Sequence, residues 1–269
     1  MLHLLGSRKL SVSWLRYSRG VSPFSSATSD IRVPSRHLFD RSIFPALRDW
    51  LFPATCCHCG TYGRFLCANC YQLTTFEPLP VRLALDPLHL SQVIAMAKYA
   101  GPIKSMVIRM KYGQVKAVAA DLAHLLYWTT AIPTADIITA VPMHPSKQRR
   151  RGFNQAELVA KALGTHLRIP YQPLLRKTIA TAPQAKAVSR AARLKHLRHS
   201  FALNTDRSVV PAKPTESEQP RVPTKPSTDS SVLLVDDIVT TGTTLNECAR
   251  LLKNAGYRRV FGLTLAHGR

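Results

Sequence analysis

The sequence predicts an α/β protein with an open, mainly parallel sheet and flanking helices, preceded by a small four-cysteine module. Three observations support this fold class. Short apolar segments typical of buried parallel strands alternate with helical patterns from residue 93 onward. One of these segments runs into two adjacent aspartates and a loop of small hydroxyl residues. Two cysteine pairs lie close together before the alternation begins.

The expected elements follow in chain order. Apolar runs predict strands at 93–98, 137–141, 232–235 and 260–265. Helical patterns are expected at 103–110, 117–128, from 155 to about 164, and 245–255. Asn154, with Glu157 three residues on, forms a capping-box-like start to the third helix, and Gly164 and Gly256 are the expected ends of the last two. Short connections between alternating elements imply right-handed crossovers, and therefore a parallel sheet.

Composition divides the chain into three parts. Residues 1–36 are predicted to be a disordered basic extension, residues 37–75 a zinc-binding module and residues 76–269 the α/β domain. Five prolines among Ser, Thr and Lys predict a disordered insertion at 211–231. No apolar run approaches the ~18 residues that span a bilayer, so we expect a soluble protein without a membrane partner.

The charge balance is strongly basic, with 37 Lys plus Arg against 15 Asp plus Glu and a formal net charge of +22. Such an excess favours polyanionic partners, among them single-stranded DNA; an ordinary solvated basic surface is the alternative. A phosphate site would already account for part of the excess. The first 29 residues contain no acid. They resemble an organelle transit peptide, and they also fit a disordered bacterial extension or a start codon assigned too early.

A ribose 5-phosphate site is predicted where the strand at 232–235 ends. Asp236 and Asp237 follow it at the carboxyl edge of the sheet, where open α/β sheets bind ligands. The hydroxyl-rich loop around Gly242 then enters a helix, which suits a phosphate monoester, while two carboxylates suit vicinal hydroxyls. A simple turn cap is the alternative, but it gives no reason for two adjacent, mutually repelling carboxylates. P-loop and dinucleotide-binding motifs are absent.

A basic half of the site is expected after the strand at 137–141. Residues 147–151 hold one lysine and three arginines, expected in a loop beside the phosphate loop at the same sheet edge. The Arg151 guanidinium suits pyrophosphate oxygens, and Gly152 permits close backbone approach; a solvated basic loop is the alternative. Residues 176–200 hold seven basic residues and no acid. A mobile flap over an anionic ligand, a nucleic-acid-contacting face and an inert solvated face stay open for them.

The cysteine pairs predict a structural zinc site. Cys56 and Cys59, and then Cys67 and Cys70, form two Cys-x-x-Cys pairs separated by seven residues. Two such pairs make a tetrahedral Cys₄ site, with no open position for catalysis. Redox pairs or unliganded thiols are the alternatives. Cys57 breaks the pair spacing, and His58 is a substitute ligand with less support.

Together these motifs resemble the ComF family, which includes the competence protein ComFC and GntX-like proteins. The segment Asp236–Thr244 resembles the phosphoribosyl-pyrophosphate (PRPP) motif of type I phosphoribosyltransferases. The resemblance runs from about Leu51 to the end and includes the zinc knuckle and the Arg-Gly-Phe-Asn-Gln segment at 151–155. One departure is His196, because the family usually has Asn after Arg-Leu-x.

The resemblance implies a type I phosphoribosyltransferase fold, structural Zn²⁺, and Mg²⁺ with PRPP. It implies that the ribose hydroxyls are held, directly or through Mg²⁺ water, by the candidate catalytic residues Asp236 and Asp237. The 5-phosphate would lie among Thr240, Thr241, Gly242, Thr243 and Thr244. The pyrophosphate would lie against Arg151, Gly152, Asn154 and Gln155. The flap would comprise Arg176, Gln184, Arg190 and Arg193.

Two function classes stay open at this point. The first is a phosphoribosyltransferase that transfers ribose 5-phosphate from PRPP to an unidentified acceptor. The second is a non-catalytic module that binds single-stranded DNA or a nucleotide with the same fold. The resemblance links both to DNA uptake in natural transformation, with competence DNA-processing proteins as partners. Family members are mostly bacterial and cytoplasmic and begin near Leu51. We therefore expect a cytoplasmic protein, and we favour a disordered extension or a start codon assigned too early over a transit peptide.

Overall fold

The computed structural model describes residues 53–78, 80–179, 200–204 and 230–268, all within one compact unit. The predictions on the extension 1–36, on residues 211–229 of the insertion, and on Gln184, Arg190 and Arg193 lie outside the described residues. No helix in the described part of the chain combines the length and apolar character that a membrane crossing requires.

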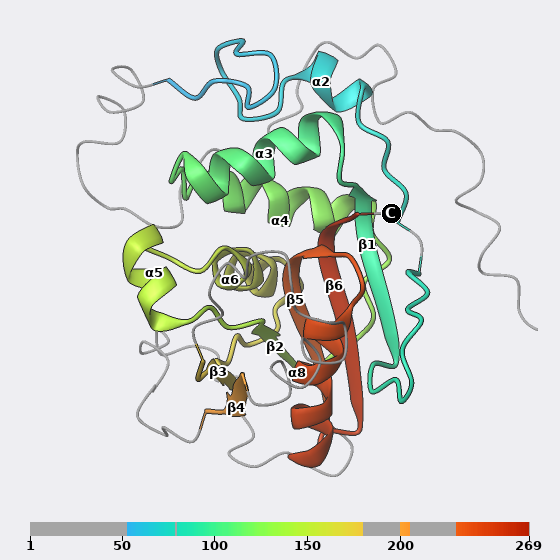
Figure 1. The fold of residues 1–269 in the computed structure, drawn as a ribbon. Helices are drawn as coiled ribbons and strands as arrows, with labels where there is room; N and C mark the ends of the chain where they lie inside the picture. The colour runs from blue at the N-terminus through green and yellow to red at the C-terminus, as the bar shows by residue number, and fades with distance from the viewer. Residues whose placement is uncertain (1–52, 79, 180–199, 205–229, 269) are drawn as a thin grey trace, which may run out of the picture. The chain divides into compact units, whose positions relative to one another are not determined.

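A four-stranded parallel sheet forms the centre of the unit (Figure 1), as the alternation predicted. Its order is β1 (Gln92–Lys98), β6 (Arg259–His267), β5 (Ser231–Val239) and β2 (Ile137–Ala140). The strand predicted at 232–235 is β5, and the expectation that it ends at Val235 is wrong. β5 pairs with β2 only as far as Val235, but it continues along β6 to Val239. The two aspartates therefore lie on the part of β5 that extends past the shorter β2.

Four helices of 12 or 13 residues flank the sheet: α3 (Gly101–Tyr112), α4 (Val118–Thr129), α6 (Gln155–Leu167) and α8 (Thr243–Asn254). All four were predicted, but the end of α6 was not. Gly164 lies inside that helix, where a Cβ would come within 2.7 Å of the Ile169 carbonyl oxygen. The glycine allows the chain to turn back closely against α6, rather than ending the helix.

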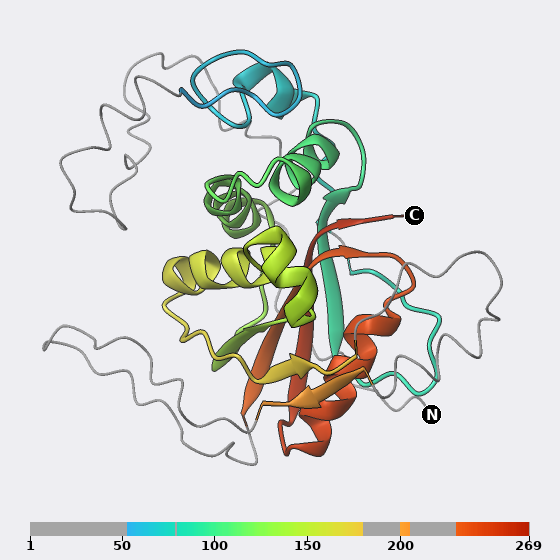
Figure 2. The ribbon, with the colours of Figure 1, turned by 60° about the vertical axis from the view of Figure 1, so that its left-hand side comes forward.

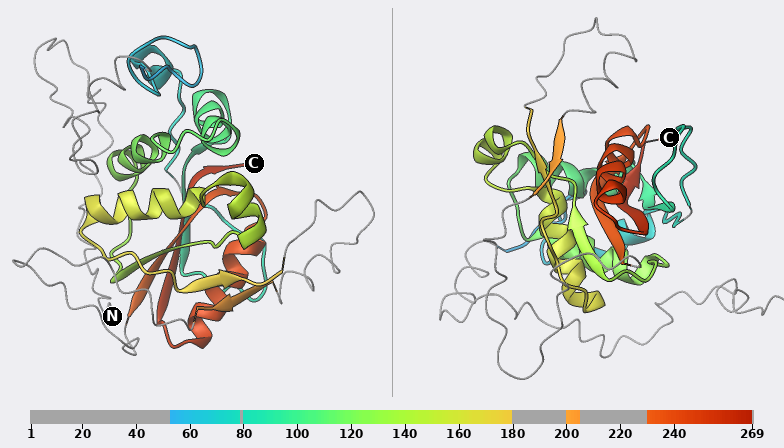
Figure 3. Two further views of the ribbon diagram at one scale, coloured as in Figure 1. Left: turned by 90° about the vertical axis from the view of Figure 1, so that its left-hand side faces the viewer. Right: turned by 90° about the horizontal axis from the view of Figure 1, so that it is seen from below.

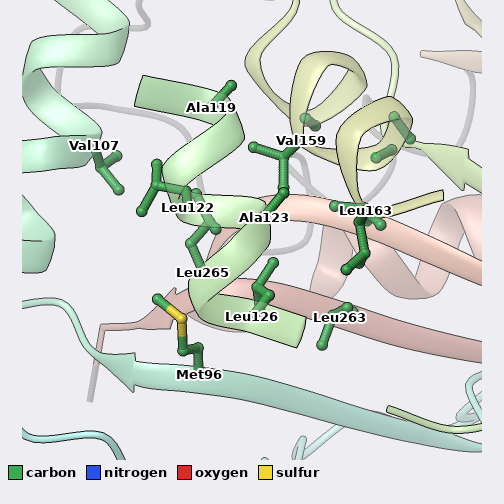
Figure 4. Packing of buried hydrophobic residues seen from close by; sticks show 14 of the residues in the cluster. Met96, Val107, Ala119, Leu122, Ala123, Leu126, Val159, Leu163, Leu263 and Leu265 are labelled. Carbon is green, nitrogen blue, oxygen red and sulfur yellow. The ribbon is translucent and has the colours of Figure 1, made fainter. Parts of the chain in front are cut away.

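The helices cover both faces of the sheet, as Figure 2 shows for α3, α4 and α6 on one side and α8 on the other. Strand residues alternate between the two cores. Ile94 and Met96 of β1 pack with the three-helix face, and Val93 and Ala95 pack with the α8 face. Figure 4 shows the first core, in which Leu122 and Leu126 of α4 lie close to Met96 and the β6 leucines.

After the neighbouring strands β2 and β5, the chain continues to opposite faces of the sheet. β2 leads through α5 (Pro145–Arg151) to α6, which packs on β2 and β5 from one face. β5 leads directly to α8, which packs on the other face. The antiparallel hairpin β3 (Leu175–Lys177) and β4 (Phe201–Leu203) lies beside α8 (Figure 3). This divergence makes the carboxyl ends of β2 and β5 the switch point, where open α/β sheets form their ligand crevice.

Candidate functional site

The loop between β5 and α8 has the geometry of an anion site. Gly242 has φ +75° and is the N-cap of α8, so residues 240–242 turn sharply into the helix. The Thr241 and Thr243 hydroxyl oxygens lie 2.9 Å apart. A pocket of about 50 Å³ is lined by Asp236 and residues 238–245. Unpaired N–H groups and the helix dipole at such a terminus favour a bound anion.

A segment from earlier in the chain borders this loop. A Cβ on Gly242 would lie 2.3 Å from Leu83 Cδ1. Asn246 of α8 fixes the same segment, because its Oδ1 accepts from the His89 N–H at 2.7 Å and its Nδ2 donates to the Pro87 carbonyl at 2.9 Å. No sequence pattern pointed to these contacts.

Asp236 and Asp237, which we call the acid pair, are half-buried and have lysines nearby. Burial, and then the neighbouring Asp237 charge, raise the pKa of Asp236 to about 8. Asp236 Oδ1 accepts the Asp237 N–H at 2.8 Å. Lys111 Nζ of α3 lies 2.6 Å from Asp237 Oδ2, a contact that sequence reasoning missed. Burial, and then the charge of Lys147, lower the pKa of Lys177 in β3, while Asp236 acts in the opposite direction.

The basic segment is a helix, α5, and not the expected loop. Its last residue, Arg151, precedes Gly152, which ends the helix with φ +83°. Arg151 Nη1 donates to Gln155 Oε1 at 3.0 Å, and its guanidinium lies 5.5 Å from the centre of the Tyr112 ring. β2 and β5 are neighbouring parallel strands, and α5 comes after β2 as the phosphate loop comes after β5. Both segments therefore lie at the same edge of the sheet. Lys147 of α5 is close enough to Asp237 for the two charges to interact.

The remaining predicted residues of this half are internal. Asn154 begins α6, but its side chain does not cap the helix: Nδ2 donates to the Val141 carbonyl at 3.0 Å. Gln155 is buried, with its oxygen on Arg151. These two amides are therefore placed to hold the end of β2 and Arg151. Arg176, the one described flap residue, is exposed on β3, and its Nε donates to the Leu203 carbonyl.

The four predicted cysteines come together. The Sγ atoms of Cys56, Cys59, Cys67 and Cys70 all lie within 4.8 Å of one another, and those of Cys59 and Cys67 are 3.6 Å apart. Zn–S bonds of about 2.3 Å in a tetrahedron place sulfurs about 3.8 Å apart, so the cluster fits a zinc ion. Cys57 packs against the core, and burial raises its pKa to about 11. His58 instead faces α3, with Nδ1 3.0 Å from the Ser105 hydroxyl.

Protein purified without added metal is expected to contain near one zinc per chain, because thiolate coordination supplies folding energy that so short a segment cannot bury for itself. Cys59→Ser should lower the zinc content and the solubility. Cys57→Ser is the matched control and should keep the metal. Elemental analysis of freshly purified, reduced protein checks this. Absence of metal, or equal loss in both variants, would contradict the Cys₄ assignment.

Comparison with protein families gives one match that bears on the site. Residues 156–268 match the model described as "Phosphoribosyl transferase domain". This part of the chain is therefore similar to phosphoribosyl transferase domains. The matched range begins in α6 and includes β5, the acid pair, the phosphate loop and β6. The observed parallel sheet with its flanking helices confirms the α/β fold class predicted from the sequence.

Two curated relatives match more of the chain than residues 156–268. "Competence protein F" of Haemophilus influenzae is 26% identical over 220 residues, which cover 78% of this chain and 84% of that protein. "DNA utilization protein YhgH" of Escherichia coli K12 is 27% identical, covering 78% and 88%. This distant homology over most of the chain confirms the resemblance to the ComF family.

Among solved structures, adenine phosphoribosyltransferase from Thermoanaerobacter pseudethanolicus is 13% identical, covering 74% of this chain and 98% of that one, with a TM-score of 0.32.

Proposed function

We propose that the phosphoribosyl transferase domain binds PRPP, or a ribose 5-phosphate nucleotide, in the crevice between β2 and β5, and that the protein acts in DNA uptake. One observation carries the proposal. Asp236, the hydroxyl-rich loop and the N-terminus of α8 line one pocket at the switch point of a parallel sheet, and Asp237 is the next residue of β5. A sugar phosphate has the complementary groups, a phosphate monoester and vicinal hydroxyls, at neighbouring positions.

The roles follow from these positions. Residues 240–244 would hold the 5-phosphate with hydroxyls and backbone N–H groups. Asp236 and Asp237 would accept hydrogen bonds from the ribose hydroxyls. Arg151, held by Gln155, would meet the pyrophosphate.

Mg²⁺ fits this site as an ion carried by the bound PRPP, and not as an ion held by the two aspartates alone. Asp237 already pairs with Lys111, and Asp236 Oδ1 accepts a backbone N–H, so the acid pair does not present a carboxylate cage. Mg²⁺ in phosphate sites is commonly held by substrate phosphates with one or two carboxylates. We therefore assign the Mg²⁺ to the pyrophosphate of PRPP.

Two activities share this arrangement. Transfer of ribose 5-phosphate to an acceptor would make Asp236 and Asp237 candidate catalytic residues, with the departing pyrophosphate charge stabilised by Arg151. Binding without turnover would use the same contacts to sense PRPP or a nucleotide. Release of pyrophosphate in the presence of candidate acceptors separates the two.

A role with single-stranded DNA is the second part of the proposal. Two relatives are named for competence and for DNA utilization, and the chain carries a net charge of +22. Lys147, Arg149 and Arg150 are exposed on α5, next to the ribose phosphate site. A positively charged surface of this kind binds nucleic-acid backbones in a salt-dependent way.

One pair of variants tests whether the two ligands use different arginines. Arg149→Gln with Arg150→Gln should reduce the slope of log affinity for single-stranded DNA against log salt by about 1.4, because each neutralised phosphate contributes about 0.7 to that slope. PRPP affinity should be unchanged. Arg151→Gln should show the reverse, with PRPP binding weakened by about 1.5 kcal/mol or more. Calorimetry for PRPP and fluorescence anisotropy for DNA measure both; an unchanged DNA slope would rule out α5 as the contact surface.

A further inference from the structure

A lysine from a helix far earlier in the chain forms an ion pair with Asp237 of the acid pair. Lys111 Nζ lies 2.6 Å from Asp237 Oδ2, and the two side chains are only 15% and 22% exposed. Lys111 is in the last turn of α3, and the preceding Met106, Val107 and Met110 are fully buried in the core. The position of the ammonium group is therefore fixed by a packed helix. Partly buried pairs are screened by salt far less than surface pairs.

The acid pair has further positive neighbours. Lys147 of α5 lies near enough to act electrostatically on Asp237, and Lys177 of β3 acts in the same way on Asp236. Three ammonium groups from three separate elements thus act electrostatically on the two acids, and that of Lys111 is in direct contact with Asp237. This gives the ribose end of the site a net positive charge, which suits an anionic sugar phosphate.

We propose that Lys111 is the resident cation of the ribose end of the site. It holds Asp237 as a charged hydrogen-bond acceptor, in the place that a divalent metal would otherwise take. The inference rests on the proposed function, because it assumes that ribose binds at the acid pair. It follows that a ligand without pyrophosphate binds independently of Mg²⁺.

Removal of the Lys111 charge should make ribose binding dependent on metal. Asp237 would then lose its ion-pair partner and keep only the more distant charge of Lys147, and Mg²⁺, which prefers carboxylate oxygens as ligands, could replace the lost charge. Lys111→Arg keeps a cation at the same position and should keep binding independent of Mg²⁺. Lys104 lies on the same helix and is exposed, so Lys104→Gln is a matched control for loss of one positive charge.

Calorimetric titration with ribose 5-phosphate, once in EDTA and once in Mg²⁺, tests the proposal. The unaltered chain and Lys104→Gln should bind equally well in both conditions. Lys111→Gln should bind about tenfold more weakly in EDTA, as expected when one charged interaction is removed, and Mg²⁺ should restore part of that affinity. Thermal unfolding of each variant establishes that it is folded.

Two results would overturn the role of Lys111 and leave the proposed function intact. One is saturable binding of ribose 5-phosphate by the unaltered chain in Mg²⁺ but not in EDTA. The other is equal affinity of Lys111→Gln and the unaltered chain in EDTA. If the unaltered chain binds neither ribose 5-phosphate nor PRPP in either condition, the proposed function fails as well.

Discussion

The double variant Asp236→Asn, Asp237→Asn is expected to bind PRPP about 100-fold more weakly than the unaltered chain, or worse. The substitutions keep the shape of both side chains and replace each carboxyl group with a neutral amide. Above about pH 8, where Asp236 is also ionised, two hydrogen bonds from the ribose to charged groups would be removed, each contributing about 1.5–3 kcal/mol. Calorimetry with Mg²⁺–PRPP measures the change. The melting temperature should change little, because the repulsion between the carboxylates disappears together with the Lys111 pair.

Asp136→Asn is the matched control for this variant. Asp136 directly precedes β2, at the amino ends of β2 and β5, where its Oδ2 accepts hydrogen bonds from Ser231 N at 2.7 Å and Ser231 Oγ at 2.8 Å. Its substitution should lower stability and leave PRPP affinity intact. If Asp236 and Asp237 only cap a turn, their double variant will fold and bind PRPP normally, which would contradict their assignment to the ribose.

The variant Gly242→Val is expected to lose detectable PRPP binding. A β-branched residue is strongly disfavoured at φ +75°, and its Cβ would lie 2.3 Å from Leu83 Cδ1. The loop must therefore move, and with it the N–H groups at the start of α8 that would hold the phosphate. Calorimetry with Mg²⁺–PRPP and with ribose 5-phosphate should both show the loss.

Gly256→Val is the matched control, which distinguishes the effect of backbone strain on stability from an effect on PRPP binding. Gly256 follows the other end of α8 and also has positive φ, at +99°. A valine there strains the backbone at the far end of the same helix without approaching the phosphate loop. It should lower the melting temperature and keep PRPP affinity. Equal loss of binding in both variants would mean that Gly242 acts through stability alone.

The sequence predicted the parts of the molecule that local patterns determine. The strands at 93–98 and 137–141, the start of α6 and the convergence of Cys56, Cys59, Cys67 and Cys70 all follow from periodicity or from ligand spacing over short distances. The parallel pairing of the sheet also follows, since short crossovers between parallel strands allow few arrangements.

The errors have identifiable physical causes. The charge of residues 145–151 favours a loop, yet a proline at the first position and Gly152 in the left-handed conformation delimit a short helix. Gly164 does not end its helix as expected, because it serves close packing against Ile169. Tertiary contact, rather than local preference, decided its role.

Other parts of the site depend on contacts between distant segments. Lys111 and Leu83 precede the phosphate loop by well over a hundred residues, and neither lies in a recognisable motif. Their side chains reach the acid pair and the loop only because α3 and the segment around Leu83 pack where they do. Such placements depend on the whole fold, so no pattern in a single sequence could indicate them.

Binding of Mg²⁺–PRPP to the unaltered, zinc-loaded chain tests the central claim most directly. Isothermal calorimetry should show saturable binding near one PRPP per chain, and ribose 5-phosphate should compete for the same site. Thermal unfolding should shift upward with PRPP concentration, as it does for any ligand that binds only the folded state. No saturable binding of PRPP or ribose 5-phosphate up to millimolar concentration would contradict the account.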